Sequence, residues 1–151
     1  MKTKTNYINE LTINYNKKLF SSNRITCSKD AEQIIREIYF KTSSKIEVKE
    51  YFFIILLNRA NEVIGYNKLS EGGICGTVVD IRLAFASALK SLAVSVILVH
   101  NHPSGNIEAS KQDIDITHKF IKAGDLLEIM IFDHIILTSN SYYSFADKGL
   151  I

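Results

Sequence analysis

Cysteine, proline and long apolar runs are all scarce in this chain of 151 residues. Its two cysteines, Cys27 and Cys75, are far apart and form no Cys-x-x-Cys pair, which excludes a disulfide framework and a cysteine zinc site and fits a reducing compartment. The longest apolar run, residues 51–57, is far too short to cross a bilayer, and the N-terminus lacks the apolar stretch of a signal peptide. We therefore expect a soluble, cytoplasmic protein with no membrane partner.

A strong excess of either charge is also missing. The chain has 18 Lys and Arg against 16 Asp and Glu, and the two kinds are interspersed, with a net charge of +2. This balance does not indicate a strongly basic nucleic-acid-binding surface. The length and the 46% hydrophobic content suffice for one domain with its own core, and no repeat or second domain is indicated.

The pattern of apolar residues predicts helices interleaved with strands. Residues 1–28 form an N-terminal arm with a weak strand signal, and residues 29–151 form the main domain. The elements expected there are a helix over 29–41 capped by Ser28, strands over 51–57 and 62–69, and a helix from Asp80 to Leu92 with five residues packed inward, Leu83, Phe85, Ala86, Leu89 and Leu92. They continue with a strand over 94–99, a helix after Ser110 ending at Gly124, and strand structure over 126–137 interrupted at Asp133 and His134. This order predicts a three-layer α/β/α sandwich with a mixed sheet.

Two histidines stand at the end of the β-branched run over residues 94–99. A strand places residues i and i+2 on the same face, so His100 and His102 point the same way and can share one metal ion. Pro103, the only proline, has no N–H for a strand ladder and should end the strand.

A third ligand follows in a segment with helical spacing. Ser110 and Asp113 have the spacing of a helix cap, and Asp113 falls in the expected first turn. A strand end and a helix start joined by a short loop can bring His100, His102 and Asp113 to within about 2.0–2.2 Å of one Zn²⁺. Three protein ligands leave the fourth tetrahedral position open, which is typical of a catalytic zinc site.

Hydrolysis at such a site also needs a base to take a proton from water, and a carboxylate suits that task. Reasoning from the residues alone does not choose among the candidates, which are Glu47, Glu50, Glu62, Glu71 and Glu108.

These residues carry a resemblance to a known family. His100-x-His102, seven further residues, Ser110, two residues and Asp113 match the JAMM (MPN+) metalloprotease motif at every spacing. The surrounding His-Asn-His-Pro-Ser-Gly and the later Asp133-His134-Ile-Ile resemble the RadC family, a bacterial branch of that superfamily, from about Lys29 to Ile151. The resemblance implies the α/β/α fold of JAMM and cytidine-deaminase-like domains, in a short form without the helix-hairpin-helix region of full-length RadC proteins.

The resemblance also implies roles for particular residues. Glu50, just before the strand over 51–57, would be the general base, with Glu71 as the alternative, and Ser110 would donate a hydrogen bond to the oxyanion. Asn101 departs from the Ser or Thr of many JAMM members, which puts the substrate class in doubt rather than the metal. Asp133 and His134 fit either a structural pair or partners that orient a ligand imidazole.

The function implied by the resemblance is that of a zinc metallopeptidase or isopeptidase acting on a peptide or isopeptide bond. Two alternatives stay open: a DNA-associated repair module of RadC type, to which the balanced charge gives little support, and a zinc-binding scaffold without catalysis. The sequence leaves the substrate and the oligomeric state open.

Overall fold

The computed structural model describes residues 24–42, 46–72 and 78–151. The predicted N-terminal arm therefore lies mostly outside the described residues. The elements are α1 (Ser28–Thr42), β1 (Tyr51–Leu57), β2 (Val63–Glu71), α2 (Ile81–Ser91), β3 (Ser95–Asn101), α3 (Lys111–Leu127), β4 (Met130–Leu137) and β5 (Tyr142–Ser144). Within the described ranges, none of the helices has the length and apolar character needed to cross a membrane.

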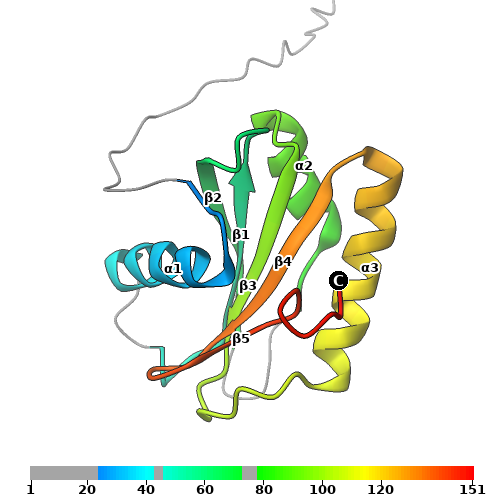
Figure 1. The fold of residues 1–151 in the computed structure, drawn as a ribbon. Helices are drawn as coiled ribbons and strands as arrows, with labels where there is room; N and C mark the ends of the chain where they lie inside the picture. The colour runs from blue at the N-terminus through cyan, green and yellow to red at the C-terminus, as the bar shows by residue number, and fades with distance from the viewer. Residues whose placement is uncertain (1–23, 43–45, 73–77) are drawn as a thin grey trace, which may run out of the picture.

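The five strands form one mixed sheet in the order β2-β1-β3-β4-β5. Only β3 and β4 pair in parallel, and α3 makes the crossover between them, while the other neighbours are antiparallel. In Figure 1, α1 lies on one side of the sheet and α2 and α3 lie on the other. The predicted three-layer α/β/α sandwich with a mixed sheet is confirmed.

Each face of the sheet has its own apolar core, because successive side chains of a strand point to opposite faces. Phe53 and Ile55 pack with α1, and Phe52 and Ile54 pack with α2 and α3. Strand β1 is consequently buried at every position, as the unbroken apolar run over residues 51–57 indicates.

The orientation of α2 differs from the prediction, although its Asp80 cap is present. Ala84, Phe85 and Ala88 are buried, whereas Leu83, Leu89 and Leu92 are exposed. The two alanines face the sheet, and their small side chains allow the helix to approach it closely. The prediction is therefore right for Phe85 and wrong for the three leucines and for Ala86, which is also exposed.

Three local predictions are also wrong. Helix α1 already includes Ser28, whose hydroxyl donates to Asp147 instead of capping the helix. Gly124 lies inside α3, which continues to Leu127. The residue that caps the helix is Glu128, whose backbone has the left-handed conformation. The Cβ of an alanine at Gly124 would stand 2.4 Å from the Ile129 carbonyl oxygen, so close packing requires the glycine. Strand β4 is continuous through Asp133, with a bulge instead of a break.

Candidate metal centre

The first two predicted ligands lie where β3 ends. His100 pairs with Phe52 of β1 and is 1% exposed, and Asn101 is the last residue of the strand. The backbone N–H of His102 still donates to the Leu137 carbonyl of β4, at 3.0 Å, which continues the strand direction for one more residue. Both imidazoles therefore point to the same face of the sheet, as the period of two predicted.

Asp113 reaches the same place from the first turn of α3. The Ser110 hydroxyl accepts from the Asp113 N–H at 3.2 Å, and Asp113 Oδ2 accepts from the Ser110 N–H at 2.7 Å and from its hydroxyl at 2.6 Å. This capping box fixes the carboxylate and leaves Oδ1 facing His100 Nε2 at 3.0 Å. Ser110 thus orients the third predicted ligand.

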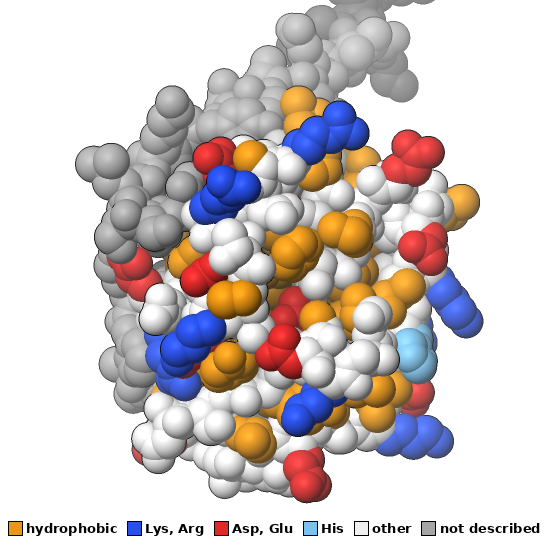
Figure 2. All heavy atoms as spheres, viewed as in Figure 1, with side chains coloured by type: hydrophobic (Ala, Val, Ile, Leu, Met, Phe, Trp, Pro, Cys, Tyr) orange, Lys and Arg blue, Asp and Glu red, His pale blue; other side chains and the backbone are white. Residues whose placement is uncertain are grey.

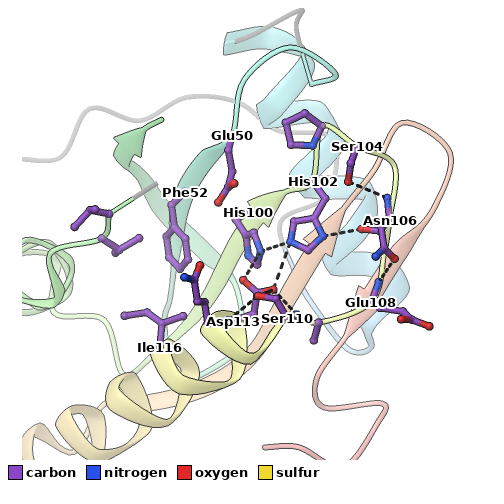
Figure 3. Close-up of a pocket in the computed structure, with 15 residues that line it drawn as sticks. Glu50, Phe52, His100, His102, Ser104, Asn106, Glu108, Ser110, Asp113 and Ile116 are labelled. Atoms are coloured by element: carbon purple, nitrogen blue, oxygen red, sulfur yellow. Dashed lines mark hydrogen bonds and ion pairs between the residues drawn. The ribbon is translucent and has the colours of Figure 1, made fainter. Parts of the chain in front are cut away.

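The three side chains converge on one point (Figure 3). His100 Nε2 and His102 Nε2 are 2.9 Å apart, His102 Nε2 is 3.5 Å from Asp113 Oδ2, and the ligand atoms of all three residues lie within 4.8 Å of one another. Tetrahedral bonds of about 2.0–2.2 Å to zinc separate neighbouring ligand atoms by roughly 3.3–3.6 Å, so only small movements are needed. The group could hold a metal ion.

The hydrogen bond that His102 makes on the side of the ring away from the cluster gives the imidazole the tautomer that a metal ligand needs. His102 Nδ1 is 2.6 Å from the Asn106 carbonyl oxygen, which can only accept, so Nδ1 carries the proton. In the neutral ring the lone pair is then on Nε2, the atom that faces the cluster. Two imidazoles and a carboxylate form a donor set that suits zinc.

The electrostatics of the cluster favour a bound cation. Burial raises the pKa of Asp113, but the interactions with His100, His102 and Ser110 together outweigh it and hold the pKa well below its usual value. The interaction with the Asp113 carboxylate raises the pKa of the His102 imidazole. Asp113 is therefore ionised at neutral pH, and its charge stabilises positive charge beside it.

Glu50 stands on the wall of a pocket of about 700 Å³ that opens over this cluster. Its side chain extends from the residue before β1 toward His100, as Figure 3 shows. Burial is the largest influence and raises the pKa of the Glu50 carboxyl, with a smaller opposing effect from His100 and His102. Among the described residues, none donates a hydrogen bond to this carboxylate, which leaves it open to the pocket.

The other candidate glutamates are placed differently. Glu71 is outside the pocket lining and binds Lys49 and Lys68, both at 2.8 Å, and these bonds lower its pKa to about 2. Glu47 accepts from Ser139 and Glu62 accepts from Asn58. Glu108 lines the pocket. The structure therefore separates Glu71 from the cluster and brings Glu50 to it.

Asn101, the residue that departs from the JAMM pattern, faces the opposite side of the sheet from its two histidine neighbours. Its Oδ1 accepts from the Tyr51 N–H at 2.8 Å, and its Nδ2 donates to the carbonyls of Ile46 at 2.6 Å and Lys49 at 2.8 Å. These bonds hold the backbone on both sides of Glu50. This role could not be predicted from the residues, since the partners are about fifty positions away along the chain.

Asp133 and His134 have separate roles. Asp133 accepts hydrogen bonds from Ser144 Oγ, the Ala146 N–H and the His134 N–H, and so holds the C-terminal segment. The fully buried His134 ring instead contacts His100, with its Nε2 2.8 Å from His100 Nδ1. Burial lowers the pKa of His134, which is therefore neutral.

A three-layer α/β sandwich with two histidines at a strand end and an aspartate in the next helix is the fold and site of a JAMM-superfamily domain. The family model for the RadC-like JAB domain matches residues 25–150. The chain belongs to this family, as its two motifs predicted.

Curated relatives agree with this assignment. A UPF0758 protein of Flavobacterium johnsoniae is 44% identical over 127 residues, which are 84% of this chain and 53% of the relative. A UPF0758 protein of Salinibacter ruber is 38% identical over 128 residues, or 85% of this chain and 53% of the relative. A UPF0758 protein of Alkaliphilus metalliredigens is 45% identical over 103 residues, which are 68% of this chain and 44% of the relative. The chain thus spans about half the length of the curated relatives it matches.

Proposed function

We propose that this domain is a zinc-dependent amide hydrolase, a metallopeptidase or isopeptidase in which Glu50 acts as the general base. The observation that carries the proposal is the convergence of His100, His102 and Asp113 in a pocket whose wall bears the half-buried carboxyl of Glu50. A metal-binding cluster beside a carboxylate of raised pKa is the combination that hydrolysis by an activated water requires.

The two histidines and Asp113 would hold the ion. When bound, zinc supplies a Lewis acid that polarises a carbonyl and makes hydroxide available near neutral pH. Glu50 takes one proton from the attacking water as the oxygen joins the carbonyl carbon. It passes that proton to the amide nitrogen as the C–N bond breaks, which releases a carboxylic acid and an amine. At neutral pH the proton of the acid moves to the amine, so the final products are a carboxylate and an ammonium ion.

Ser110 would donate a hydrogen bond to the oxyanion, and its surroundings make this feasible. Its hydroxyl donates a hydrogen bond to Asp113 Oδ2, but that oxygen also accepts from the Ser110 backbone N–H at 2.7 Å. The hydroxyl can therefore turn toward the pocket while the backbone bond still holds the carboxylate. Ser110 lines the pocket, as this role requires.

The charge of the pocket favours a neutral amide substrate over nucleic acid. Its described lining includes three carboxylates, those of Glu50, Glu108 and Asp113, and no lysine or arginine. On the face seen in Figure 2, Lys and Arg side chains are scattered among acidic and apolar ones. Binding to the DNA backbone instead needs clustered positive charge.

The first test is the metal content of purified protein, measured by plasma mass spectrometry for the wild type and His102→Ala. We expect about one zinc per chain in the wild type and none in the variant, because a structural or catalytic zinc site needs at least three protein ligands. A wild type that stays metal-free after zinc is supplied would refute the proposal.

The second test compares hydrolysis of peptide and isopeptide libraries by the wild type, Glu50→Gln and Glu71→Gln. Glu71→Gln is the matched control, because it removes a nearby carboxylate that lies outside the pocket. We expect Glu50→Gln to keep zinc and lose hydrolysis, while Glu71→Gln keeps both. Full activity in Glu50→Gln would remove the assigned base, and zinc retention without hydrolysis of any library would favour the scaffold alternative.

A further inference from the structure

A chain of hydrogen bonds leads from His100 away from the pocket into the core. His100 Nδ1 is 2.8 Å from His134 Nε2, and His134 Nδ1 is 2.6 Å from Thr117 Oγ1. Thr117 lies one helical turn beyond Asp113 in α3, and its hydroxyl is 2.5 Å from the Asp113 carbonyl oxygen. All three side chains are 0–1% exposed, so water does not compete for these bonds.

The contact between Thr117 and the Asp113 carbonyl determines which atom donates in every hydrogen bond of this series. A carbonyl oxygen only accepts, so the single proton of the Thr117 hydroxyl is donated to Asp113, as is usual for a helical threonine and the residue four before it. The same hydroxyl must then accept from His134, which places the proton of that ring on Nδ1. His134 Nε2 is left as an acceptor and takes the proton on His100 Nδ1.

The consequence is that the His100 lone pair is on Nε2, the atom facing His102 and Asp113. His102 also has its proton on Nδ1 and its lone pair on Nε2, because its Nδ1 donates to the Asn106 carbonyl. The two Nε2 atoms therefore face each other at 2.9 Å, each with a lone pair and no proton to share. Two such lone pairs repel unless a cation lies between them, so the hydrogen-bond chain prepares the cluster for a metal ion.

We propose that Thr117 and His134 are positioning residues that hold His100 in its metal-binding tautomer through the backbone carbonyl of Asp113. Asp113 thus contributes twice, with its carboxylate as a ligand and with its carbonyl as the fixed end of the chain. The rings of Phe52 and Phe145, 5.7 Å and 4.6 Å from His134 between centroids, keep the His134 ring in place. This inference rests on the metal site of the proposed function and not on its hydrolytic activity.

Zinc affinity tests the inference without a substrate. Thr117→Val keeps the shape of the side chain and removes the hydroxyl, and Thr117→Ser keeps the hydroxyl. Thr138→Val is the matched control, because Thr138 is also buried and its hydroxyl donates to a backbone carbonyl, that of Ser141, outside the pocket lining. Affinity is measured by competition with a fluorescent zinc chelator, and thermal unfolding in chelator verifies that each variant is folded.

We expect Thr117→Val to lose zinc affinity by roughly 10- to 100-fold, as is typical when the partner of a ligand histidine is removed. Thr117→Ser and Thr138→Val should bind zinc within about threefold of the wild type. A Thr117→Val protein that binds as tightly as Thr138→Val would overturn the inference.

The tautomers themselves are measured by ¹⁵N NMR of the histidine rings in metal-free wild-type protein, which requires no variant to fold. We expect the proton on Nδ1 in both His100 and His134. A proton on His100 Nε2 would mean that the chain runs in the opposite direction, and the inference would fail. If the wild type binds no zinc, the proposed function fails, while the ring protons still decide whether the hydrogen-bond chain is as described.

Discussion

Zinc should stabilise the folded protein, and His102→Ala should abolish this effect. The three ligands come from the end of β3 and the start of α3, so the site is complete only when these two elements are packed together. Zinc therefore binds the folded chain in preference to the unfolded chain. Above the dissociation constant, each tenfold rise in free zinc adds about 1.4 kcal/mol to the free energy of unfolding.

The expected shift in melting temperature follows from the length of the chain. For domains of about 150 residues, 1 kcal/mol moves Tm by roughly 2–4 °C, so each tenfold rise in zinc should raise Tm by about 3–6 °C. In chelator, His102→Ala should lie only a few degrees below the wild type, because it loses one hydrogen bond to Asn106, worth about 1 kcal/mol.

Differential scanning fluorimetry across a series of buffered zinc concentrations measures this slope. His118→Ala is the control, because His118 is exposed on α3 and outside the pocket lining. It should keep the full slope. A wild type whose Tm does not change with zinc, or a His102→Ala protein with the wild-type slope, would refute the reasoning.

Three further predictions concern the residues around the site. Because burial raises the Glu50 pKa in the metal-free protein, its carboxyl should titrate above pH 4.5 in ¹³C NMR of protein held in chelator, and a midpoint below 4.5 would contradict this. Asn101→Ala should lower the free energy of unfolding in urea by about 2–4 kcal/mol, because it removes the hydrogen bonds to the Tyr51 N–H and to the carbonyls of Ile46 and Lys49. Gly124→Ala should lower the free energy of unfolding by about 1–3 kcal/mol in the same assay, despite the higher helix propensity of alanine. Gly65→Ala is the control and should be tolerated, because its Cβ would make an ordinary 3.6 Å contact with Leu56. Equal stabilities of the two variants would argue against the packing explanation.

The features predicted well from the sequence depend on short-range rules. The period of two along a strand put His100 and His102 on one face, and the capping pattern put Asp113 in the first turn of a helix. The choice of Glu50 depended on family resemblance, because reasoning from the residues left five glutamates open. The structure distinguishes Glu71 by its ion pairs with Lys68, three residues before it in β2, and with Lys49, which precedes β1.

The contact between His134 and His100 was one of two alternatives that the sequence left open, and the residues alone could not decide between them because the contact depends on a bulge. In the parallel pairing of β3 and β4, Val96 lies opposite Ile131 and Ile97 lies opposite Asp133, so one residue of β4 is skipped. From there on, the side chains of β4 change faces, and His134 joins the face that carries the metal ligands. A regular strand would have turned it toward α1.

The buried face of α2 was predicted correctly at Phe85 and incorrectly at its other predicted positions, for a related reason. The large apolar residues suggested one stripe, but Ala84 and Ala88 allow the closest approach to the sheet, and Phe85 packs against Phe120 of α3. Packing between helices decided which side was buried, and the sequence of α2 alone contains no information about α3.

The candidate metal ligands lie close together along the chain, whereas the proposed base lies far from them. His100 and Asp113 are thirteen positions apart and are joined by one loop, whereas Glu50 reaches the site through the antiparallel pairing of β1 with β3 and the bonds to Asn101, about fifty positions away. Contacts between nearby residues form at lower entropic cost than distant ones. Under the proposed function, a partly folded chain could therefore bind zinc before β1 is in register. Metal content would then report the formation of the loop and helix, and only hydrolysis would report that the sheet is complete.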